Sequence, residues 1–240
     1  MPEQIRAHIN LFGAWIAGVS VNDVISKKTG TDALRMLIEA VLERSVDSLE
    51  PVAIERFADL SPQDLYLPVV PDEQKLVDRL LRPLKSAKRQ YCFGEFLATI
   101  ALSGLVGESL AMLRYRMRKP ELHGKPISIE QERQLFGRDF DSLDQSRRVE
   151  ILRSFELISD VQKQLFSDLR GIRNKYLHLW EVDSSQIHVE ARKSFLNAMR
   201  LFKEISGLSI GPDGTFIMNP DLLNYLKDQE KKEAAETLIT

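Results

Sequence analysis

Cysteine is almost missing from this sequence. The 240 residues contain one, Cys92, so the chain cannot form an internal disulfide or a cysteine-based zinc site. A single cysteine fits a reducing compartment, and we therefore expect a cytoplasmic protein. The net charge is also small, at −2, so a surface that binds nucleic acid would have to be a local basic patch.

Long apolar runs are scarce as well. The most apolar stretch, residues 96–107, lies between Glu95 and Glu108 and is 12 residues long, whereas a membrane span needs about 20. The first ten residues, MPEQIRAHIN, lack the basic-then-apolar order of a signal peptide. We therefore expect a buried core helix at 96–107 and no contact with a membrane.

Several motifs of catalysis and metal binding are absent too. The sequence has no glycine-rich phosphate loop, no G-x-S-x-G and no H-E-x-x-H. His8, His123 and His188 lie far apart and have no carboxylate at ligand spacing. We expect neither a metal nor a cofactor.

Helical patterns dominate what is present, so the sequence predicts an all-α fold. Apolar residues recur every three or four positions in residues 3–18, and Thr31 resembles the N-cap of a following helix. The three prolines of residues 61–74 predict an extended stretch, which is the best candidate for a boundary. A long apolar helix is expected over 91–118, and a small C-terminal hairpin around Pro212-Asp213-Gly214.

Local signals predict helix starts and close helix packing. Three Ser-x-x-Gln boxes could each supply a side-chain acceptor and donor at a helix N-terminus: Ser128–Gln131, Ser142–Gln145 and Ser159–Gln162. Small residues in the long apolar helix, Gly104 and Gly107 among them, would allow another helix to approach closely.

The segment LRGIRNKYLHLW, residues 169–180, places a cation, Arg173, close to its own predicted apolar side. Val161, Leu165, Leu169, Ile172, Tyr176 and Trp180 form the predicted apolar stripe. At about 100° per residue, this stripe is centred roughly 40° from Arg173. Arg170, Asn174, His178 and Glu181 form a separate polar ridge beside it.

A guanidinium near a packed face needs a carboxylate or a bound anion. Glu108 is the best internal partner for Arg173, because it follows Leu97, Ala101 and Gly104 on the long helix. Glu95 is the second choice. The alternative is a phosphate, since the planar fork of an arginine suits phosphate oxygens and a histidine near neutral pH can move a proton.

The stretch RNKYLH, Arg173–His178, resembles the signature of HEPN domains: an arginine, a polar residue and, after a spacer, a histidine. The resemblance covers residues 89–206 and implies a helical bundle. We therefore expect an N-terminal helical region of unknown role at 1–88, a HEPN-like bundle at 89–225 and a charged tail at 226–240. Residues 147–178 more weakly resemble the mannitol operon repressor group, which is thought to act through protein contacts.

The HEPN resemblance implies a metal-independent endoribonuclease in a toxin or phage-defence setting. In that chemistry the 2′-hydroxyl of RNA attacks the adjacent phosphate. His178 would transfer the proton, Arg173 would stabilise the developing charge, and Asn174 would orient the histidine or the phosphate. The resemblance also implies a homodimer, in which two such signatures form one composite site. A regulatory protein such as an antitoxin would be a further partner.

RNA would also need cations to hold its backbone. Arg170 is one candidate, and Arg114, Arg116, Arg118 and Lys119 form another group, with Tyr115 available to stack on a base. The other interpretation of this group is a solvated helix end, where cations are favourable. The other interpretation of the whole pattern is a non-catalytic regulator or adaptor, in which Arg173 and His178 only hold the bundle or dimer together.

Overall fold

The computed structural model is all-α, as the sequence predicts, with two small antiparallel hairpins, of which the sequence predicts the C-terminal one. It describes residues 45–60, 75–177, 183–207, 209–210 and 216–237. The helix expected at 3–18 and the cap expected at Thr31 lie outside these ranges.

The chain divides into two compact units, residues 1–56 and 57–240. In the first unit the described elements are the 3-10 helix η1 (Val46–Ser48) and most of α3 (Leu49–Asp59). The second unit contains the other elements: α4 (Lys75–Phe93), α5 (Phe96–Met117), β1 (Glu121–Leu122), β2 (Lys125–Pro126), α6 (Ile129–Phe136), η3 (Phe140–Ser142), α7 (Gln145–Ser154), α8 (Asp160–Leu177), η4 (Ser184–Gln186), α9 (Ile187–Ser206), β3 (Ser209–Ile210), β4 (Phe216–Ile217) and α10 (Pro220–Thr237).

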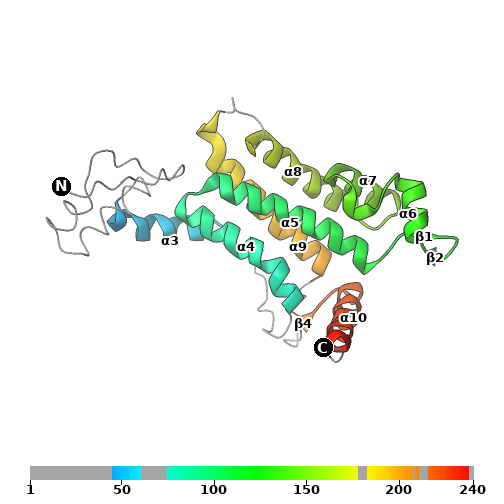
Figure 1. Cartoon of the computed structure of the whole chain (residues 1–240). Coiled ribbons are helices and arrows are strands. Elements are labelled where there is room, and N and C mark those ends of the chain that lie inside the picture. Colours follow the sequence, from blue (N-terminus) through cyan, green and yellow to red (C-terminus); the bar gives the residue numbers. More distant parts are fainter. Residues whose placement is uncertain (1–44, 61–74, 178–182, 208, 211–215, 238–240) are drawn as a thin grey trace, which may run out of the picture. The chain divides into compact units, whose positions relative to one another are not determined.

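Helix α5 is the centre of the second unit. It packs against α4, α8 and α9, and α9 also packs against α8 and α4. In Figure 1, α4 and α8 lie along opposite sides of α5, and α9 lies behind it. Because α5 has neighbours on three sides, its buried residues are distributed around much of its circumference, which explains its weak helical periodicity.

The predicted boundary at 88/89 falls inside α4. That boundary was placed where the HEPN resemblance begins, but Leu84, Ala87 and Tyr91 of α4 are all buried in the main core. The Thr99 hydroxyl of α5 also donates to the Ala87 carbonyl, at 3.4 Å. Helix α4 is therefore part of the bundle.

The joint between α4 and α5 differs from the single helix expected over 91–118. Gly94 has a φ of +86°, a left-handed conformation that glycine adopts at little cost. The amides of Gly94 and Glu95 donate to the carbonyls of Tyr91 and Gln90, at 2.9 and 2.8 Å. These bonds end α4, and α5 begins at Phe96.

The predicted tail also begins too early in the sequence. Helix α10 starts at Pro220, and both Leu222 and Leu226 are buried in the core. The predicted boundary at 226 therefore falls inside α10, whose first turns belong to the bundle.

The apolar run at 96–107 is part of a longer helix than the run itself indicates. The run extends into a helix of 22 residues, and α5 is the one helix among the described residues that is long and apolar enough to cross a membrane. In this fold part of that apolar surface packs against α4, α8 and α9, while Leu97 and Leu105 are 46% and 44% exposed.

Two of the three predicted capping boxes are confirmed. Ser128 and Gln131 form a complete box at the start of α6. At the start of α8, the Gln162 amide donates to Ser159 Oγ at 3.2 Å, and the Ser159 amide donates to Gln162 Oε1 at 3.0 Å. The Ser142 prediction is wrong, because Asp144 caps α7 by accepting from the Arg147 amide at 2.9 Å.

The hairpins are short. The predicted C-terminal hairpin is confirmed by the pairing of Ser209 with Ile217, although its turn residues lie outside the described ranges. The other hairpin pairs Glu121 with Pro126, and its turn residues His123 and Gly124 have φ values of +53° and +76°. Positive φ at both turn positions is typical of a two-residue hairpin loop.

The N-cap of α7 gives a test of this local structure. We expect Asp144→Ala to lower the free energy of unfolding by about 1 kcal/mol, because it leaves a helix N–H without its acceptor. The control is Ser142→Ala, which should be close to neutral. Urea denaturation followed by circular dichroism measures both variants, and a larger loss for Ser142→Ala would contradict the assignment.

The same cap should depend on pH. The Arg147 amide, assisted by the Ser146 amide and the nearby cations, lowers the pKa of Asp144 below its ordinary value. The contribution of Asp144 is therefore present above the ordinary carboxyl pKa of about 4, and it is lost as pH falls through the lowered value. The difference between parent and Asp144→Ala should shrink at that acidic end.

Candidate functional site at the end of helix α8

Helix α8 carries the predicted signature, and its core side differs slightly from the predicted stripe. Phe166, Leu169 and Ile172 are buried, whereas Val161 is 64% exposed. Val161 lies in the first turn of α8, where the helix has begun but its apolar stripe has not yet reached the bundle. The buried stripe therefore begins later than the sequence pattern indicates.

The stem of Arg173 explains how a cation can lie near the packed side of a helix. A Cβ atom added at Gly104 of α5 would lie 2.5 Å from Arg173 Cδ and 3.3 Å from Cγ. The methylene stem therefore occupies the space that any other residue at 104 would fill. The apolar stem is packed against α5, and the charged head reaches the edge of the interface.

The guanidinium of Arg173 pairs with Glu108, the partner expected from the sequence. Arg173 Nη1 donates to Glu108 Oε1, and each side chain is 31% exposed. Glu108 lies one turn after Gly104 on α5, so the arginine crosses the helix at the glycine and meets the carboxylate next to it. This half-buried position leaves part of the guanidinium accessible to solvent.

A second glycine supports the same close approach of helices. A Cβ at Gly107 would lie 3.2 Å from Leu169 Cδ1 and 3.2 Å from Gln145 Nε2 of α7. Gln145 Nε2 is buried and has no hydrogen-bond partner among the described residues. The small residues that the sequence marked for close packing therefore perform that role at 104 and 107.

The polar ridge of α8 is on the outside of the bundle. Arg170 and Asn174 are exposed, on either side of Arg173 in the sequence. Arg170 is close enough to Asp144, the N-cap of α7, to help lower the pKa of that carboxyl. The described part of α8 ends at Leu177, and His178 lies outside the described residues.

Three of the four cations of residues 114–119 pair with carboxylates. Arg114 donates to the Leu157 carbonyl at 2.6 Å and pairs with Asp221 at 3.3 Å. Arg116 pairs with Asp141 at 2.9 Å, and Lys119 pairs with Glu132 at 3.1 Å. These side chains connect the end of α5 and the residues after it to other elements, and the carboxylates offset their charges.

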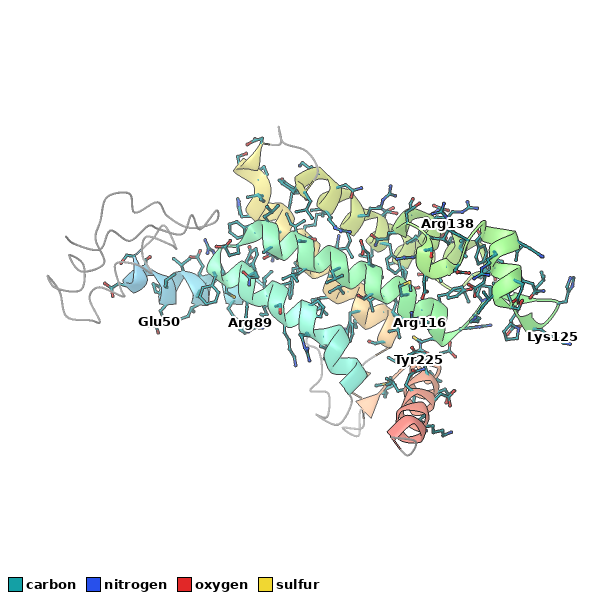
Figure 2. The ribbon with its side chains drawn as sticks, viewed as in Figure 1. Glu50, Arg89, Arg116, Lys125, Arg138 and Tyr225 are labelled. Carbon is teal, nitrogen blue, oxygen red and sulfur yellow. The ribbon has the colours of Figure 1, made fainter. Side chains whose placement is uncertain are left out.

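The location of this group also separates it from Arg173. Arg114 is ten residues beyond Gly104, or about 15 Å along the helix. Figure 2 shows Arg116 at the end of α5 that is close to Tyr225 of α10. Arg118, at the C-cap of α5, is exposed. The structure therefore does not bring this group together with the ridge of α8.

Tyr115 cannot stack on a base as the sequence suggested. Its ring is 3% exposed and is stacked on Phe140, with 3.8 Å between the centroids. Burial, with the carboxylate of Glu132 nearby, raises the pKa of this hydroxyl. Tyr115 is a neutral core residue.

Sequence reasoning missed a second group of hydrogen bonds and ion pairs that join helices of the bundle. Asp59 accepts from the Tyr91 hydroxyl at 2.7 Å and from Arg192 Nε at 2.6 Å, joining three helices. Lys175 pairs with Glu190 at 3.5 Å between α8 and α9. These partners lie far apart in the sequence, so no local pattern could have indicated them.

Metal ligands do not gather in the described part of the chain. Within residues 45–60, 75–177, 183–207, 209–210 and 216–237, no group of three or more His, Cys, Asp or Glu side chains is placed to hold a metal ion. The arrangement at the end of α8 consists of a cation, an amide and a half-buried ion pair.

Comparisons with models of known protein families, with curated proteins and with solved structures find no match. The HEPN resemblance is therefore carried by the signature residues alone.

The crossing at Gly104 can be tested with a matched pair of glycine substitutions. We expect Gly104→Ala to lower the free energy of unfolding by about 1–3 kcal/mol, because the new methyl group displaces the Arg173 stem. The control is Gly171→Ala on the exposed side of α8, where a Cβ would meet nothing within 4 Å. This variant should gain about 0.5–1 kcal/mol from helix propensity.

Chemical denaturation of the two variants gives the measurement. Equal effects of the two substitutions would show that the close approach at Gly104 is unimportant for stability.

Proposed function

We propose that the protein is a metal-independent endoribonuclease of HEPN type that acts as a homodimer in the cytoplasm. The observation that carries the proposal is the end of α8. There Arg170 and Asn174 are exposed, and Arg173 keeps about a third of its side chain accessible, at 31%. A phosphate could approach this ridge from solvent and accept hydrogen bonds from it.

The chemistry follows from these side chains. The 2′-oxygen of RNA forms a bond to the adjacent phosphorus, and the bond from phosphorus to the 5′-oxygen breaks. His178 takes the proton from the hydroxyl or gives one to the leaving oxygen. Arg173 stabilises the charge that develops on the phosphoryl oxygens, and Asn174 orients the phosphate. The products are a 2′,3′-cyclic phosphate and a 5′-hydroxyl.

The pairing of Arg173 with Glu108 is compatible with this role. An arginine has five N–H donors, and the bond to Glu108 uses Nη1. The carboxylate holds the guanidinium in one orientation, so less side-chain entropy is lost when a phosphate binds. The proposal also includes a regulatory partner, such as an antitoxin, that would restrain the activity.

A second function is favoured by the same ion pair. If Arg173 only joins α8 to α5, the fold would serve as a non-catalytic regulator or adaptor that acts through protein contacts. The packing of the Arg173 stem against Gly104 is what such a structural role requires. The weaker resemblance to the mannitol operon repressor group agrees with this alternative.

An RNA cleavage assay tests the proposed activity. We expect the parent protein to cleave single-stranded RNA in EDTA and to leave DNA of the same sequence intact, because DNA lacks the 2′-hydroxyl. The double variant Arg173→Ala, His178→Ala should cleave RNA at least a hundredfold more slowly than the parent. Lys163→Ala, on the first turns of α8, is the control and should cleave like the parent. Intact RNA with all three proteins would support the regulator.

A pair of charge-removing substitutions separates a catalytic from a structural Arg173. Glu108→Gln and Arg173→Gln both break the ion pair, and each should cost about 1 kcal/mol of stability at this half-exposed site. Only Arg173→Gln removes the cation. We therefore expect Glu108→Gln to retain RNA cleavage and Arg173→Gln to lose it.

The measurements are denaturation and single-turnover cleavage on the same preparations. Equal losses of cleavage in both variants would show that the ion pair, and not the cation itself, is what activity needs.

A further inference from the structure

Helix α4 carries a strip of exposed cations on the side that is turned away from the core. Arg82, Lys85 and Arg89 are exposed, and spacings of three and four place them along one side of the helix. At about 100° per residue they lie roughly 100–160° around α4 from Leu84, which is 2% exposed. We call these three residues the α4 basic strip, and Figure 2 labels Arg89.

Positive charge is concentrated on this helix. The sequence of α4 contains six lysines and arginines and one acidic residue, Asp78, so its net charge is +5. The whole chain has a net charge of −2, so the other residues together carry −7. Like charges three and four residues apart on a helix repel each other, so the strip lowers the stability of α4. Such an accumulation is expected where an anionic ligand offsets the repulsion.

An exposed aromatic ring continues the strip. Phe93 follows Arg89 by four residues, at the last position of α4, and is 45% exposed. Proteins hold single-stranded nucleic acid with this combination, in which cations contact the phosphates and a base stacks on the ring. A helix that binds a membrane surface instead exposes a wide apolar face. The apolar side of α4, with Leu81, Leu84 and Ala87, is buried in the core.

We propose that the α4 basic strip and Phe93 hold a single strand of RNA, with the cations on its phosphates and one base on the ring. This inference deepens the proposed function and rests on it for the choice of RNA, because neither a phosphate contact nor stacking requires a 2′-hydroxyl. The strip supplies backbone contacts that the end of α5 does not, since Arg114, Arg116 and Lys119 pair with carboxylates.

The strip lies at the height of the bundle where Arg173 meets α5. A tight turn joins α4 to α5, so the two helices are antiparallel, and the Thr99 hydroxyl donates to the Ala87 carbonyl. Counting along both helices from that contact places the strip level with about residues 97–104 of α5. Arg173 packs at Gly104, and α4 and α8 lie along opposite sides of α5 in Figure 1. A strand that crosses α5 therefore reaches both the strip and the end of α8.

The salt dependence of binding tests the strip. Fluorescence anisotropy of the full chain with a labelled oligodeoxythymidine measures affinity at about 0.05–0.2 M salt, and DNA is used because it lacks the 2′-hydroxyl. Each phosphate contact on a single strand contributes about −0.7 to the slope of the logarithm of affinity against the logarithm of salt concentration. Lys85→Gln, Arg89→Gln should make this slope shallower by about 1.4, so over that range the parent loses about sevenfold more affinity than the variant.

The matched control is Lys227→Gln, Lys231→Gln, which removes two exposed cations four residues apart on α10. This control should keep the slope of the parent, and an equal slope in the parent and the strip variant would overturn the proposal. Urea denaturation separates binding from folding. The strip variant should unfold at the same urea concentration as the parent or a higher one, because it removes like-charge repulsion. A lower midpoint with unchanged binding would assign the strip to the fold and overturn the proposal.

A substitution of Phe93 separates stacking from charge. Phe93→Leu keeps an apolar side chain but removes the aromatic face, so it should weaken oligonucleotide binding about tenfold and leave the salt slope unchanged. Unchanged affinity in this variant would overturn the role of the ring. Flotation of the parent with phosphatidylglycerol vesicles, without binding to the oligonucleotide, would assign the strip to lipid and overturn the proposal.

The RNA cleavage assay is scored separately from binding. The strip variant should cleave saturating RNA at the rate of the parent but need more RNA to reach half of that rate, because the strip does not contact the reacting atoms. Oligonucleotide binding through the strip without cleavage of RNA would refute the nuclease alone. Cleavage of RNA together with a strip variant that binds like the parent would refute the strip alone.

Discussion

The close passage of α8 over α5 at Gly104 is the constraint on which the rest of the bundle depends. A residue with a Cβ at this position would collide with the Arg173 stem, and Gly107 allows the same approach to Leu169. These contacts are in the interior of the helix interface. They therefore set both the distance between α5 and α8 and the relative position of the two helices along their axes. The position of α8 along α5 in turn decides where the polar ridge of α8 reaches the surface.

Arg173 combines two roles that are usually assigned to different residues. Its methylenes fill a groove in the core, and its head is held by Glu108 at the boundary with solvent. A buried cation without a partner would cost several kcal/mol, whereas a half-exposed one with a carboxylate is tolerated at little cost. A cation fixed in this way is also pre-positioned for an anion, so a structural origin does not exclude a functional use.

Sequence reasoning succeeded where the physics is local. The boxes at Ser128 and Ser159 involve atoms three residues apart, and the need of Arg173 for a carboxylate followed from the cost of burying charge. It failed where distant residues decide. Arg114 seemed a free cation, but its partner Asp221 is 107 positions away. The boundary at 88/89 followed the start of the resemblance, whereas the buried Leu84 and Ala87 join α4 to the core. Asp144 replaced Ser142 as the cap because a 3-10 turn precedes α7.

The apolar character of α5 has a consequence for biosynthesis. This helix leaves the ribosome well before α8 and α9, which end at Leu177 and Ser206, have been made. Until then α4 is the only one of its three main neighbours that is available, so the nascent chain exposes a helix with the length and composition of a membrane span. Chaperones that recognise such segments would compete with the membrane-insertion machinery for the chain. The time at which α8 and α9 emerge thus determines when that competition ends.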